Sequence, residues 1–165
     1  MVSVIFALFL FFGIFSFAGA TLLLVHYRND RRPYILLWVI ASIFIGIGVT
    51  GVSFKEYLPD FVSYKLSNAL TLGAAVLFNY SLSSLSGKVI HLWKAVCSSL
   101  LFAALIVLTF VLVSEYIGPR NQPLVVAIVS AVFSFYGGYL AHQFYKKSQI
   151  SLASILALIF YAGAL

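Results

Sequence analysis

The sequence predicts an all-α integral membrane protein: a bundle of about six transmembrane helices with short loops and the N-terminus outside. Composition is the first reason, because 63% of the 165 residues are hydrophobic and 8% are charged, with a mean hydropathy of +1.10. Soluble domains carry about 25% charged residues. The second reason is a series of apolar segments, most of them long enough to cross the ~30 Å hydrocarbon core. The third is an aromatic content of 17%, which suits lipid-facing surfaces and interfacial belts.

These segments predict one transmembrane domain with spans at residues 2–25, 34–52, 61–85, 95–113, 123–145 and 150–165. No basic residue precedes the first segment, so we interpret it as a span; a signal peptide begins with positive charge. The fourth segment has few polar residues, and we expect it to face lipid more than its neighbours do. The last segment would reach about 24 Å as a helix, against about 30 Å of hydrocarbon. We therefore expect the chain to be the membrane part of a longer protein.

The basic residues between the spans predict the orientation. Seven fall on the side of the first, third and fifth loops, namely Arg28, Arg31, Arg32, Lys88, Lys94, Lys146 and Lys147. Three fall on the other side, namely Lys55, Lys65 and Arg120. Cytoplasmic loops are enriched in Lys and Arg, so the first side is expected to be cytoplasmic, with Trp38 as an interfacial anchor. The basic residues behind the net charge of +6 are therefore explained by the orientation of the spans in the membrane, and we expect no nucleic-acid partner.

A polar stripe distinguishes the third span, which follows Asp60, a candidate helix N-cap. At about 100° per residue, its members fall within about 20° of one line: Asn68, Ala75, Asn79 and Ser86. Lipid offers no hydrogen bonds, so the stripe should face other helices or a cavity. The residues on the other side of this helix include Leu66, Leu70, Ala74 and Phe78.

We interpret the stripe first as interhelical hydrogen bonding, worth about 0.6–2 kcal/mol per asparagine, and second as the polar wall of a ligand cavity. Small residues also recur along one face of the second span (Ser42, Gly46, Thr50) and of the fifth (Ser130, Ser134, Gly137, Ala141). Such faces predict close helix packing. If the fifth-span face meets the stripe, the two would line a small pocket. The candidate ligand-binding residues are Asn68, Ala75, Asn79, Ser130, Ser134, Tyr136 and Gly137.

Residue patterns that carry catalysis are missing from the sequence. It has no paired carboxylates within a span, no His-x-x-x-His, no glycine-rich phosphate loop and no GxSxG. The single cysteine, Cys97, predicts neither an internal disulfide nor a metal site. We therefore expect this chain not to be an enzyme, with no catalytic residue, no metal and no cofactor. The acidic residues lie in loops or at span ends, which disfavours ion-coupled transport.

Several short motifs follow one another in an order that resembles that of a known family. A basic loop, His26-Tyr-Arg-Asn-Asp-Arg-Arg-Pro33, precedes Trp38, the outer turn Leu58-Pro59, the helix start Ser67-Asn68-Ala69 and finally Gly87-Lys88. Over roughly the first 90 residues this order resembles the multi-helix sensory regions that precede cytoplasmic diguanylate cyclase (GGDEF) domains in bacteria. The resemblance implies a multi-pass protein of the bacterial inner membrane, with an output domain that this sequence does not contain.

These observations favour a membrane-embedded input domain that binds a small or lipidic ligand between its helices. Its short outer loops cannot form a separate ligand domain, so recognition would occur inside the bundle. The ligand would shift the population between two helix packings. Expected partners are membrane lipid and that ligand, and a homo-oligomer is left open. The alternatives are a small transporter or channel, which predicts inverted repeats and broken helices that we do not find, and a structural membrane subunit.

Overall fold

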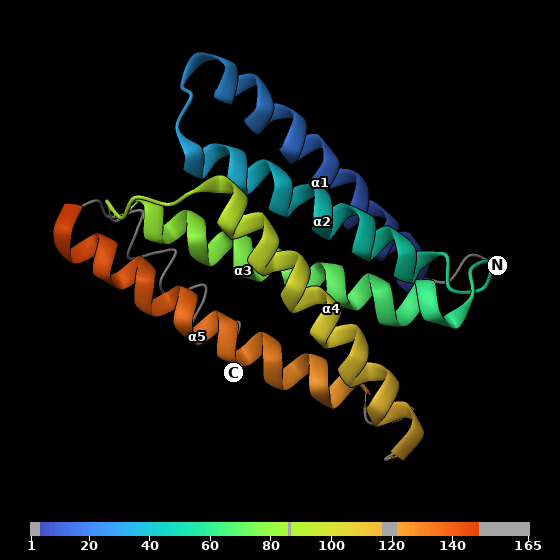
Figure 1. The fold of residues 1–165 in the computed structure, drawn as a ribbon. Coiled ribbons are helices and arrows are strands. Elements are labelled where there is room, and N and C mark those ends of the chain that lie inside the picture. Colours follow the sequence, from blue (N-terminus) through green and yellow to red (C-terminus); the bar gives the residue numbers. More distant parts are fainter. Residues whose placement is uncertain (1–3, 86, 117–121, 149–165) are drawn as a thin grey trace.

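The computed structural model in Figure 1 is a bundle of helices and describes residues 4–85, 87–116 and 122–148. In chain order it contains α1 (Val4–Asn29), α2 (Pro33–Ser53), the π-helical turn η1 (Phe61–Leu66), α3 (Ser67–Leu85), α4 (Leu92–Tyr116) and α5 (Gln122–Ser148). No strand occurs in this described part. With η1 and α3 taken together, five helices within these described ranges are long and apolar enough to cross a membrane, and the chain is a multi-pass membrane protein. The expected sixth span, residues 150–165, lies outside the described residues.

Successive helices run in alternating directions, and α3 lies in the middle of the bundle (Figure 1). α1 packs against α2, and α2 packs against α3, which also contacts α4 and α5. The fourth span was expected to face lipid more than its neighbours do, which is confirmed against the third span (39% buried) but not against the fifth, whose buried share of 22% equals that of α4. In α1, 11% of the apolar segment is buried, against 22% in α4. α1 lies at the edge of the bundle, whereas α4 covers α3.

Glycines on two sides of α2 let it approach both of its neighbours closely. A methyl group added at Gly46 would lie 2.9 Å from Phe17 Cζ of α1. A methyl group added at Gly48 would lie 2.5 Å from the carbonyl oxygen of Ser67, at the start of α3. The small face expected in the second span is therefore confirmed at Gly46, and a second such face meets α3.

The core consists of two clusters that share α3. The first joins α2, α3 and α4 through Leu37, Ala41, Ala74, Leu77 and Ala95; the second joins α3 and α4 through Ala69, Leu72, Ala103, Ile106 and Phe110. Valines of α5 pack against the second cluster. Because Ala74 is fully buried, the side of α3 opposite the asparagine stripe also contacts protein.

The two ends of the η1–α3 unit differ from each other. At its start Asp60 already has helical dihedral angles (φ −51°, ψ −34°), and its side chain makes no capping hydrogen bond. The N-cap prediction was wrong because a capping residue needs an extended backbone. At the other end Gly87 has φ 92°, Gly87 N–H donates to Ser84 O, and Lys88 N–H donates to Ser83 O. This pattern is a Schellman C-cap.

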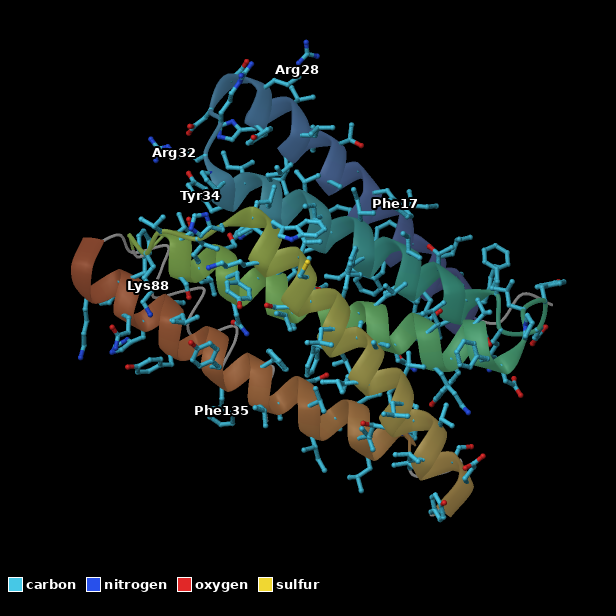
Figure 2. The ribbon with its side chains drawn as sticks, in the orientation of Figure 1. Phe17, Arg28, Arg32, Tyr34, Lys88 and Phe135 are labelled. Carbon is cyan, nitrogen blue, oxygen red and sulfur yellow. The ribbon has the colours of Figure 1, made fainter. Side chains whose placement is uncertain are left out.

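Basic residues gather at one end of the bundle. α1, α3 and α5 end there, and α2 and α4 begin there, which brings together Arg28, Arg31, Arg32, Lys88, Lys94 and Lys146. Figure 2 shows Arg28, Arg32 and Lys88 at this end. The acids Glu56, Asp60 and Glu115 lie toward the opposite end. Alternating helices therefore collect charges that are far apart in the sequence.

Candidate functional site

Asn79, in the second half of α3, is a polar side chain buried in the bundle. It is 6% exposed, and its amide nitrogen Nδ2 has no hydrogen-bond partner in the described structure. A buried donor that loses water without gaining a partner costs about 1–3 kcal/mol. The cost makes such groups rare, so an unpartnered buried amide calls for an explanation.

Asn79 also lines a cavity of about 250 Å³ between α3 and α5. Its described lining comes from α3 (Val76, Asn79, Tyr80, Ser83) and from α5 (Phe133, Tyr136). The α3 residues follow the i, i+3, i+4, i+7 spacing of one helix face, and the α5 pair is spaced i, i+3. The cavity is therefore formed where one face of each helix meets the other.

α4 supports both walls of this cavity. On the α3 side, the hydroxyl of Tyr80 donates to Ser98 Oγ at 3.2 Å. On the α5 side, the rings of Phe102 and Phe133 meet edge to face, with centroids 4.9 Å apart. Two turns of α3 earlier, Ser99 Oγ donates to Gly73 O at 2.7 Å. α4 therefore contacts two of the cavity-lining aromatic residues, Tyr80 and Phe133, and fixes the positions of their rings.

Chemically, the cavity presents a neutral donor among mostly apolar walls. No described lining residue carries a charge. Among the residues the structure describes, no group of three or more His, Cys, Asp and Glu could hold a metal ion. The lining offers a buried amide donor and three aromatic rings to a bound molecule.

Two of the seven residues proposed from the sequence as ligand contacts, Asn79 and Tyr136, line this cavity. The other five lie on the same two helices but are not among its described lining residues. Of these, Gly137 is buried, and the rest are half-buried: Asn68, Ala75, Ser130 and Ser134.

Four lining residues were not proposed from the sequence, namely Val76, Tyr80, Ser83 and Phe133. Val76 and Ser83 lie three residues before and four after Asn79, so a search for one helix face around that asparagine would have found them. Tyr80 and Phe133 lie outside the polar stripe and the small face, so neither pattern indicated them.

The proposed anchor residues fall into two groups. Arg28, Arg31, Arg32 and Lys146 are exposed at the basic end, where Arg32 Nε lies 3.1 Å from Asp30 Oδ1; the side chain of Lys147 lies outside the described residues. Trp38 instead packs edge to face on Phe78, with ring centroids 5.9 Å apart. Its indole nitrogen is buried without a described partner. An interfacial anchor would present this nitrogen to the headgroups.

Comparison with known proteins adds nothing to this geometry, since no family model, curated protein or solved structure matches the chain. The resemblance to sensory regions of diguanylate cyclases therefore stays a prediction from short sequence motifs. The evidence for a site is the buried amide and the cavity beside it.

Proposed function

We propose that this chain is a membrane-embedded input domain of a bacterial signalling protein, and that a membrane-soluble ligand binds at Asn79 between α3 and α5. The observation that carries the proposal is an unpartnered amide, 6% exposed, beside a cavity of about 250 Å³. A permanent structural role would be better served by a satisfied or apolar side chain. A ligand that satisfies the amide would remove the energetic cost.

Ligand binding would act on the packing of α5. This helix contacts α3 across the cavity and makes few contacts with α4. A ligand shifts a conformational equilibrium only by its differential affinity for the two states. Satisfying the Asn79 amide in one packing and not in the other would supply such a difference. At about 1–3 kcal/mol, the shift would be roughly 5- to 150-fold.

The output is proposed to lie on the cytoplasmic side of the inner membrane. α5 ends at Ser148, at the basic end of the bundle, which the positive-inside rule assigns to the cytoplasm. The sequence resemblance suggests a diguanylate cyclase as the output. In this proposal the chain itself performs no catalysis and relays a helix rearrangement.

A fusion tests this relay. The full chain is joined after Leu165 to a diguanylate cyclase catalytic domain and produced in a bacterium that lacks other cyclases, with linkers varied over one helical turn. Cyclic diguanylate is measured at equal membrane levels of each variant. Asn79→Leu should change the output at least about five-fold, whereas Asn68→Leu, on the same helix but outside the described cavity lining, should change it little.

A second variant tests the same cavity in case Asn79→Leu alone does not change the output. Val76→Phe fills the same cavity from the same helix face and should also change the output, because it occupies the space of the ligand. Wild-type output from both Asn79→Leu and Val76→Phe, in fusions that are otherwise active, would contradict the proposal.

A further inference from the structure

We infer that the cavity at Asn79 binds a neutral ring compound through a carbonyl oxygen. This inference rests on the proposed function and specifies the chemical class of its ligand. The unsatisfied atom is the amide nitrogen Nδ2, which carries two N–H donors and no acceptor. The complementary group on a ligand is therefore a hydrogen-bond acceptor, and a carbonyl oxygen is the simplest acceptor that is stable in hydrocarbon.

The ligand is neutral because the cavity has nothing to balance a charge. Its described lining residues are Val76, Asn79, Tyr80, Ser83, Phe133 and Tyr136. None of these is Asp, Glu, Lys, Arg or His. Moving an ionised carboxylate or ammonium group into such a site would cost far more than one amide hydrogen bond returns. Fatty acids in their charged form and amines are thereby disfavoured.

The walls favour a flat ring of limited size. Three aromatic rings line the cavity, and the hydroxyl of Tyr80 already donates to Ser98 Oγ. An apolar cavity of about 150 Å³ binds one benzene ring, so 250 Å³ accommodates roughly two fused rings. Tyr136 is 49% exposed, so a ring can enter past it from the lipid, where a chain attached to the ring could remain.

Three bicyclic probes of nearly equal size separate the possible interactions. 1-Indanone offers an acceptor, indole offers a donor, and indane offers neither. The full chain in lipid nanodiscs is labelled with 15N-asparagine, which gives four side-chain amide signals because the sequence has four asparagines. The signal absent in Asn79→Leu belongs to Asn79. Each probe is titrated at matched concentration in the membrane phase.

The expected result is that 1-indanone shifts the Asn79 amide signal and binds about ten-fold more tightly than indane or indole, as one added hydrogen bond allows. In Asn79→Leu, where labelled Val76 methyl groups report binding, the preference for 1-indanone should vanish. Asn68→Leu should retain it. Circular dichroism of each variant confirms that the helices are intact.

The other outcomes separate the two proposals. Tighter binding of indole would overturn the carbonyl inference, because it would show that the amide accepts a hydrogen bond, and would leave a ligand site at Asn79. Equal binding of all three probes would also overturn it and would leave an apolar site. If no probe perturbs Asn79 or Val76, both this inference and the proposed ligand site are contradicted.

Discussion

The side chains of Asn79 and Trp38 each bury a nitrogen without a described partner, yet their surroundings differ. Trp38 packs its ring on Phe78 and so contributes apolar area to the α2–α3 interface, which offsets the loss at its N–H group. Asn79 is smaller and lies beside a cavity. No aromatic contact of Asn79 offsets the energetic cost of its unpartnered donor as the ring of Trp38 does. An uncompensated energetic cost at one residue is typical of functional sites, where activity lowers stability.

Replacing Asn79 with leucine should therefore stabilise the unliganded chain. Leucine has a similar size and removes the unsatisfied donor, which should raise the free energy of unfolding by about 1–3 kcal/mol. Thermal or denaturant unfolding in one detergent, followed by circular dichroism, measures this difference.

Ser81→Ala provides the contrasting case on the same helix. Ser81 is fully buried, and its Oγ donates to Tyr34 O at 3.1 Å. Its loss should lower the free energy of unfolding by about 0.5–1.5 kcal/mol. If Asn79→Leu destabilised the chain as Ser81→Ala does, Asn79 would have a hydrogen-bond partner, and the argument for a ligand would fail.

At the scale of the elements, the sequence predicts the positions of the helices better than it predicts the contacts between them. Each of the first five predicted segments coincides with a helix, because apolar length is a local property. The asparagine stripe correctly indicated that Asn79 faces protein. Phe133 was not predicted as a cavity residue, since its position depends on how α5 is rotated and shifted against α3. The π-helical turn η1 before α3 was also not predicted, because the sequence pattern does not distinguish it from an α-helix.

The glycine contacts of α2 lead to a prediction at this scale. Gly48→Ala should lower the free energy of unfolding by about 1–3 kcal/mol, the usual cost of overpacking, because its methyl group would meet the backbone of Ser67. Gly19→Ala in α1 is the matched control, since nothing lies within 4 Å of its added methyl group. The control should be neutral or stabilising by up to about 1 kcal/mol through helix propensity. Equal effects of the two substitutions would contradict the α2–α3 packing described here.

At the scale of the whole molecule, alternating helices and segregated charges belong to one arrangement. The basic residues of the first and third loops and of the end of α5 share one end of the bundle. The positive-inside rule could predict this grouping from the sequence because it depends only on the number of spans between the loops. The course of residues 150–165 is outside the described structure, so the sixth span stays a prediction.

Cysteine labelling tests this arrangement in a Cys97→Ala background. Arg31→Cys and Lys146→Cys should react with a membrane-impermeant maleimide only after the cells are permeabilised. Lys55→Cys, at the opposite end, should react in intact spheroplasts. Labelling of Arg31→Cys and Lys146→Cys from opposite sides of the membrane would contradict the alternating bundle. Reversal of all three would contradict only the orientation.

The proposed ligand site depends most on where the Asn79 amide points, and magnetisation transfer from the amide protons measures this direction. In 15N-asparagine-labelled chain in nanodiscs, we expect cross-peaks from the Asn79 amide to aromatic protons of Phe133 or Tyr136, which line the same cavity, and none to lipid acyl chains. Strong cross-peaks to acyl methylene protons, without any to aromatic rings, would place this amide against lipid and remove the proposed site.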